Sequence, residues 1–184
     1  MSGQSTLKPH DVVVACQIAI WPEETWTYKK VGASLRISTS EIFNVIKRCR
    51  HAKLVTPRSA SKTESCSQVN KAHLLDFLIH GVPTAFYPKR GEVVRGVLTA
   101  VHAPLFRSRF TSDRDIPIVW PFAKGKDMGE GLLPLYPTVP AICQQEGTLY
   151  NMLSAIDVLR VGKQREKDAA VAALASILRL DLPA

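Results

Sequence analysis

The chain has 184 residues, a formal net charge of +8 and 46% apolar residues, so it can bury one hydrophobic core or two small ones. No apolar run is long enough to span a bilayer, and the four cysteines show neither Cys-x-x-Cys nor zinc-finger spacing. The first residues, Met1 to Thr6, are polar and do not match a secretion signal. We therefore expect a reduced, cytoplasmic protein without a membrane partner or a metal site.

Positive charge is denser in the first part of the chain. Residues 1–70 contain ten Lys and Arg against five Asp and Glu, a net of +5, whereas residues 71–184 contain fourteen against eleven, a net of +3. A basic excess favours polyanions through counterion release, but it also describes an ordinary soluble surface. Charge alone therefore leaves nucleic-acid binding and a merely basic exterior open.

Three short helical patterns follow one another at the amino-terminal end. The first runs from Pro9 to Trp21, because proline suits a first turn and Pro22 stops the helix. Thr27 is a suitable cap for a second helix over residues 28–35. The third pattern begins so soon afterwards that a tight turn must join the two helices.

The third helix is predicted to have a buried stripe and a polar outer face. Ser38 is its cap, and Glu41 three residues later completes a Ser-x-x-Glu capping box. Four apolar residues recur at helical spacing on the buried side: Ile42, Val45, Ile46 and Cys49. Small polar and basic residues occupy the other side: Thr39, Ser40, Asn44, Lys47, Arg48 and His51. A polar, cationic helix outside a small helical core suits the groove of a duplex.

Over these residues the chain resembles the winged helix-turn-helix modules of bacterial transcription regulators, the MarR-like group especially. The resemblance implies that the third helix enters the major groove and that a β-wing beyond it follows the minor groove or the backbone. The wing would comprise residues 54–56, a tip with Arg58 and Lys62, and a return over residues 67–69. The Ser-rich tip fits a linker equally well, so both interpretations stay open.

A contact scheme with double-stranded DNA follows from these positions. Asn44 can make paired hydrogen bonds to adenine and Arg48 to guanine, whereas phosphate contacts position a protein without specifying sequence. The residues expected to read bases are Thr39, Ser40, Asn44 and Arg48. The residues expected to hold phosphates are Lys29, Lys30, Lys47, Arg50, Arg58 and Lys62. Basic three-helix units also serve as protein–protein modules, but we favour DNA because basic and small polar residues share one face.

The fold class we expect is α+β, with a DNA-binding domain over residues 1–70 and a second part over residues 71–184. The second part should begin with a helix over residues 69–81, ended by Gly81 and Pro83. Its role is dimerisation, effector sensing or the binding of a protein partner.

Strand composition follows that helix. The composition is typical of strands over residues 85–87 and 93–101. Between them, Lys89-Arg90-Gly91 has the composition of a turn, so we expect a β-hairpin. A third strand is predicted over residues 116–120, stopped by Pro121.

Two helices are predicted to close the chain, over residues 145–161 and 163–180, with Gly162 between them. Such a pair can form a homodimer across a two-fold axis, as an inverted-repeat operator requires, or can simply cover the small sheet. The regulator hypothesis predicts a dimer on an inverted repeat. The alternative is an antitoxin-like or adaptor protein that binds a protein partner through residues 71–184.

Candidates for chemistry are few. One acid–histidine group is a candidate, formed by Asp76, His80 and His102, and phosphate-loop, Gly-x-Ser-x-Gly and His-Glu-x-x-His motifs are absent. We therefore expect no enzyme activity and no cofactor. Three aromatic residues can line a small-molecule pocket or fill the core: Phe86, Trp120 and Tyr136.

Overall fold

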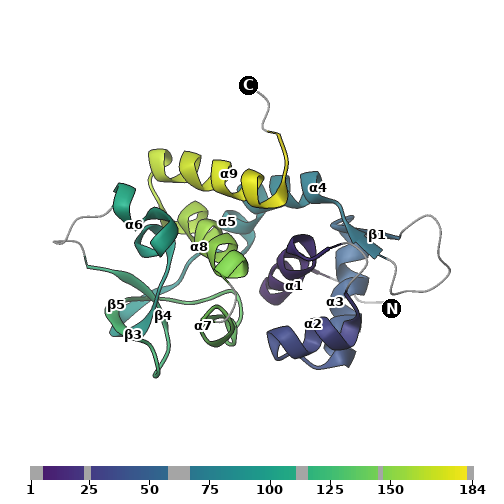
Figure 1. The fold of residues 1–184 in the computed structure, drawn as a ribbon, viewed down its shortest axis with the longest axis horizontal. Helices are drawn as coiled ribbons and strands as arrows, with labels where there is room; N and C mark the ends of the chain where they lie inside the picture. Colours follow the sequence, from purple (N-terminus) through teal and green to yellow (C-terminus); the bar gives the residue numbers. More distant parts are fainter. Residues whose placement is uncertain (1–5, 23–25, 58–66, 111–115, 145–146, 182–184) are drawn as a thin grey trace.

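The computed structural model is an α+β fold (Figure 1), as the sequence predicts. It describes residues 6–22, 26–57, 67–110, 116–144 and 147–181. The first part consists of α1 (Pro9–Ile20), α2 (Tyr28–Leu35), α3 (Thr39–His51), β1 (Val55–Pro57) and β2 (Ser67–Val69). A helical run follows, formed by α4 (Lys71–Asp76), the π-helical η1 (Phe77–Gly81) and α5 (Val82–Ala85). The remainder consists of β3 (Arg90–Leu98), the 3-10 turn η2 (Ala100–His102), α6 (Pro104–Phe110), β4 (Ile118–Pro121), β5 (Asp127–Leu132), α7 (Val139–Ile142), α8 (Gly147–Val161) and α9 (Gln164–Leu178).

The three amino-terminal helices lie where the sequence predicts them. The Thr27 side chain caps α2 by accepting a hydrogen bond from the Lys30 backbone N–H at 3.2 Å. Ser38 caps α3 in the same way, accepting from the Glu41 backbone N–H at 3.2 Å. The strands predicted beyond α3 are present as β1 and β2, which pair antiparallel with Val55 opposite Val69.

The turn between α2 and α3 is tight because Gly32 lies directly against it. Arg36 ends α2 in the left-handed conformation, with φ of 56°, and the Ile37 N–H donates to the Gly32 carbonyl at 2.9 Å. A Cβ atom on Gly32 would lie 2.6 Å from the Ile37 carbonyl oxygen, which is closer than real Cβ atoms come. Glycine is therefore required for this close approach of turn and helix.

The helix expected to stop at Gly81 continues to Ala85, so the predicted end at Gly81 and Pro83 is wrong. The Val82 N–H donates to the Phe77 carbonyl, an i to i−5 bond that forms the π-helical turn η1. Pro83 then stands in the first turn of α5, directly after the π-helical turn.

The predicted hairpin over residues 85–101 is also wrong. Residue 85 belongs to α5, and the Phe86 N–H still bonds to the Val82 carbonyl as in a helix. β3 pairs antiparallel with both β4 and β5, and these two pair parallel with each other, so that the three strands close into a small barrel. β4 confirms a third strand in the predicted region, although it begins at Ile118 and includes Pro121, which was expected to stop it.

Glycines allow this small barrel to close. An added Cβ on Gly96 would meet the Trp120 carbonyl oxygen, and one on Gly125 would meet the Gly96 carbonyl oxygen. The conformation of this region is therefore determined by pairing with strands far along the chain. The local composition, which favours a hairpin, does not determine it.

The two predicted terminal helices are confirmed as α8 and α9. α8 lies in the middle of the molecule, between the small barrel and the amino-terminal helices, and α9 runs along its edge (Figure 1). Most of α8 is buried, so this helix covers neighbours within its own chain. Among the described residues, no helix combines the length and the apolar character that a membrane crossing requires.

The expected domain boundary at residue 70 falls between β2 and α4. Buried side chains from both sides of it nevertheless belong to one hydrophobic cluster, which runs from Val12 on α1 to Leu178 on α9. α1 contacts both α8 and α9 as well as α3. The helix that supports α3 is therefore itself supported by the carboxy-terminal half.

Candidate nucleic-acid interface

The outer face of α3 is open to solvent over its first three turns. Ile42, Val45 and Ile46 are buried against the neighbouring helices, as the periodicity predicts. Four of the predicted contact residues are exposed on the other side: Thr39, Ser40, Asn44 and Lys47. The Asn44 side-chain amide donates to Glu41 at 3.4 Å and otherwise faces outward. This face is small and polar at the front of the helix and basic further along.

Arg48 does not lie on this face, contrary to the expectation that it reads a base. Its side chain is 10% exposed and forms a two-pronged ion pair with Asp11 of α1. Nε donates to Asp11 Oδ2 at 2.7 Å and Nη2 donates to Asp11 Oδ1 at 2.7 Å. The Asp11 side chain is fully buried, so withdrawal of Arg48 toward DNA would leave a buried carboxylate without its charge partner. Arg48 is therefore a structural residue at the α1–α3 contact.

Glu41 extends this ion pair to the edge of the surface. Its Oε1 accepts from Arg48 Nη2 at 2.8 Å and lies 2.9 Å from His10 Nε2. Hydrogen bonds from Arg48, then from His10, lower the pKa of Glu41 from 4.5 to about 2. The hydrogen bond to Asp11 in turn raises the pKa of Arg48. Glu41 was expected to complete a capping box, but its carboxylate bonds to side chains of the α1–α3 contact instead.

Arg50 also points away from the exposed face. Its Nη2 donates to Ser67 Oγ at 2.6 Å, and the residue is half-buried. The Trp26 indole N–H donates to the Ser67 carbonyl at 3.2 Å. Arg50 thus helps to fix β2 against the end of α3, which differs from the phosphate contact expected for it. The other two expected phosphate contacts, Arg58 and Lys62, lie outside the described residues.

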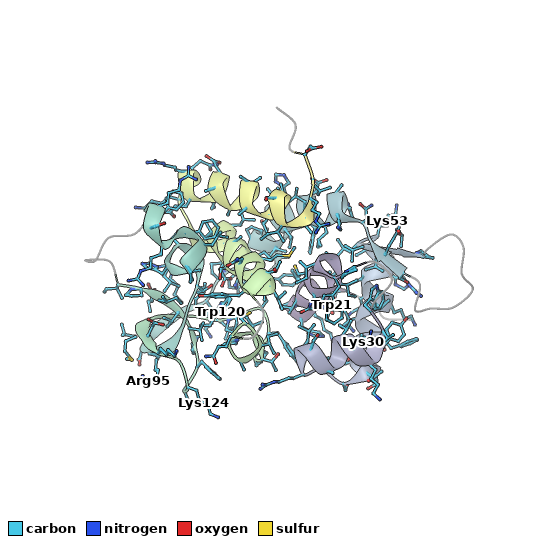
Figure 2. All side chains as sticks on the ribbon, viewed as in Figure 1. Trp21, Lys30, Lys53, Arg95, Trp120 and Lys124 are labelled. Carbon is cyan, nitrogen blue, oxygen red and sulfur yellow. The ribbon has the colours of Figure 1, made fainter. Side chains whose placement is uncertain are left out.

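Two lysines at the start of α2 are exposed as predicted. Lys29 and Lys30 lie on the first turn of that helix. Figure 2 shows Lys30 and Lys53 at the end of the molecule formed by the first three helices, far from Arg95 and Lys124 on the small barrel.

Sequence reasoning missed three residues of this surface. Phe43 is 43% exposed on α3 and packs edge-on against Tyr28, with ring centroids 6.2 Å apart. Arg36 and Lys53 are exposed in left-handed conformation at the ends of α2 and α3. Phe43 was identifiable, because the buried stripe of α3 places residue 43 outside the core. The two left-handed positions carry no sequence signal, since neither is Gly or Asn.

The histidines considered for catalysis occupy separate places. Asp76 and His80 are exposed on the α4–η1 run, whereas His102 is buried on η2 with its Nδ1 accepting from the Ile118 N–H at 3.2 Å. Within the ranges that the structure describes, no group of three or more His, Cys, Asp and Glu residues is arranged to hold a metal ion.

Comparisons with protein-family models, with curated proteins and with solved structures give no match for this chain. What the exposed face of α3 does is therefore inferred from its geometry and charge.

Replacing Arg48 by Met should lower the free energy of unfolding by about 3–5 kcal/mol, because it leaves Asp11 buried without a charge partner. Urea unfolding followed by circular dichroism measures the change. The exposed neighbour Lys47, also replaced by Met, is the control and should change stability by less than about 0.5 kcal/mol. Equal midpoints for the two variants would show that the Asp11–Arg48 pair is dispensable.

Stability should also depend on pH through Glu41. Folding lowers its pKa from 4.5 to about 2, so the folded state stays ionised at pH values where the unfolded chain takes up a proton. This contribution is complete above the unfolded pKa and is lost as the pH falls from about 4.5 toward 2. Unfolding midpoints measured across that range should converge for wild type and Glu41→Gln, and parallel curves would contradict the assignment.

Proposed function

We propose that the protein is a sequence-specific, double-stranded DNA-binding transcription regulator that reads the major groove with α3. The proposal is supported by the order of the elements: two helices joined by a tight turn, followed by a two-stranded antiparallel ribbon. In this proposal β1 and β2 form the wing of a winged helix-turn-helix module.

The observation that carries the proposal is the distribution of charge around α2 and α3. Glu41 is the only acidic residue between Thr27 and Pro57, and its carboxylate bonds to Arg48 and His10 rather than opposing the exposed cations. The exposed basic residues of this stretch are Lys29, Lys30, Arg36, Lys47 and Lys53. A surface with several exposed cations beside small polar side chains suits phosphates at its edges and base edges at its centre.

Each exposed residue has a defined part in the proposal. Thr39 and Ser40 are small, so they let the start of α3 approach the floor of the groove. Asn44 reads a base through paired hydrogen bonds, most simply adenine. Lys29, Lys30 and Lys47 hold phosphates. Arg48 and Arg50 are left out, because their guanidinium groups stabilise the unit from within.

A regulator that reads an inverted repeat acts as a dimer. We place the dimer contact on α9 rather than on α8, since α8 is buried within its own chain. α9 has an outward side of small and charged residues, among them Arg165, Asp168, Ala172 and Ser176.

A protein partner is the second candidate, and one observation favours it. Val93 of β3 and Met128 of β5 are 57% and 51% exposed, and both lie on the small barrel. Exposed apolar side chains of this size are typical of contact surfaces when they cluster. An adaptor that used only this surface would leave the cations of α2 and α3 without a function.

Loss of phosphate contacts should flatten the salt dependence of DNA binding. We expect the Lys29→Ala, Lys30→Ala, Lys47→Ala triple variant to bind every duplex more weakly and to reduce the slope of log K against log salt by about 0.9 per lysine. Fluorescence anisotropy with a mixed-sequence duplex, titrated between about 50 and 200 mM salt, measures the slope. The control with the same change of charge is Lys124→Ala, Lys126→Ala, Lys163→Ala, whose slope should match wild type. Identical slopes for both triple variants would remove α2 and α3 as the DNA surface.

Sequence specificity should depend on Asn44. Selection from a random duplex pool should enrich an inverted repeat, because a two-fold dimer presents two copies of α3. Asn44→Ala should then cost about 1–3 kcal/mol on the enriched site and almost nothing on unrelated duplexes. Enrichment of a single half-site would contradict the dimer, and unchanged affinity of the Asn44 variant would remove this residue from base reading.

A further inference from the structure

A cleft of about 450 Å³ opens where the first part of the chain meets the second. Its walls come from Pro9 at the start of α1, from Phe86 and Tyr87 after α5, and from the proline-rich segment 133–137. This volume lies in the range of small-molecule sites, which are mostly apolar with a few placed polar groups. Of the three aromatic residues predicted to line a pocket, Phe86 lines this cleft. Trp120 is buried in the core instead.

The placed polar group is Arg160 of α8, whose side chain is only 4% exposed. Nε donates to the Phe86 carbonyl at 3.0 Å, and Nη1 donates to the Leu133 carbonyl at 3.3 Å and to Asp157 Oδ1 at 2.7 Å. Nη2 takes part in none of these hydrogen bonds. Hydrogen bonds within the chain thus fix Nε and Nη1, and Arg160 is one of the residues that line the cleft.

Arg160 already has a carboxylate partner within the chain, because its Nη1 lies 2.7 Å from Asp157 Oδ1. Burial raises the pKa of Asp157, and the adjacent Arg160 opposes this rise. The other carboxylate oxygen of Asp157 accepts from Thr99 Oγ1 at 2.8 Å and from Trp120 Nε1 at 2.6 Å, which satisfies the ionised form. A ligand therefore needs to supply a hydrogen-bond acceptor for Nη2 rather than a second negative charge.

We propose that this cleft binds a compact, uncharged and mostly apolar molecule whose carbonyl oxygen accepts a hydrogen bond from Arg160, the chemistry of an amide, an ester or a lactone. Three features together define this class: the apolar walls, the volume, and the pairing of Arg160 with the carboxylate of Asp157. The site does not depend on the DNA-binding proposal, because none of its lining residues belongs to α2 or α3.

The cleft is nevertheless connected to α3 by direct contacts. Tyr136, between two lining residues, packs on the His10 ring with centroids 5.4 Å apart. His10 lies 2.9 Å from Glu41 on the first turn of α3. Further along the same segment, Thr138 donates to the carbonyl of Leu35, the last residue of α2, at 2.9 Å. A ligand that displaces segment 133–137 therefore changes the support of both helices, and we include this coupling in the proposal.

Binding is tested on the full chain with three probes of similar size: benzamide, benzoate and toluene. Backbone amide shifts in nuclear magnetic resonance spectra report binding at Tyr87 and Leu133 and coupling at residues 38–44. We expect saturable shifts with benzamide and at least about fivefold weaker binding of both other probes, since toluene lacks the acceptor and benzoate must lose its hydration without gaining a free cation.

The blocking variant is Leu133→Trp, which narrows the opening at a residue that is 57% exposed. The matched control is Leu105→Trp on α6, at a leucine that is 42% exposed and lies outside the cleft.

Benzamide binding that survives in the Leu105 variant and is lost in the Leu133 variant supports the site. No saturable shift with any probe, or equal binding by both variants, overturns it. Benzoate binding more tightly than benzamide overturns the uncharged class. Shifts that stay within the cleft lining and never reach residues 38–44 overturn the coupling. DNA is absent from every arm, so these outcomes are independent of the proposed function.

Discussion

The buried ion pair between Asp11 and Arg48 is the interaction on which the presentation of α3 depends. It joins the first turn of α1 to the third turn of α3 with two hydrogen bonds of 2.7 Å. A buried ion pair often adds little stability over apolar packing, but the loss of either partner alone is strongly destabilising. Together with the buried residues Ile42, Val45 and Ile46, the pair orients α3 so that Asn44 and Lys47 face solvent.

The carboxy-terminal half supports the same arrangement from behind. α1 is buried between α3 on one side and α8 and α9 on the other, so its position depends on both halves of the chain. The 133–138 segment adds the contacts of Tyr136 with His10 and of Thr138 with Leu35. The amino-terminal helices therefore do not pack independently of the rest of the chain, and direct contacts connect the cleft beside Pro9 to α3.

Local patterns in the sequence predicted the amino-terminal helices, their caps and the exposed positions of Lys29, Asn44 and Lys47. They succeeded there because helical periodicity and capping are local properties. They failed for Arg48, which lies at the border of the buried stripe of α3. Its side chain faces inward because it pairs with Asp11, 37 positions earlier in the chain. The prediction of a hairpin failed for a related reason. β3 pairs with strands in residues 118–132, and this pairing depends on tertiary structure rather than on local composition. The π-helical turn before Pro83 has no signal in the periodicity at all.

The central claim is that the face of α3 with Asn44 and Lys47 is the surface that meets DNA. Amide hydrogen–deuterium exchange on the full chain, with and without a saturating mixed-sequence duplex at low salt, tests it most directly. The account predicts slower exchange in peptides that cover residues 27–51, with the small barrel of β3, β4 and β5 unchanged. Slower exchange confined to the barrel, or none anywhere while the duplex is bound, would contradict it.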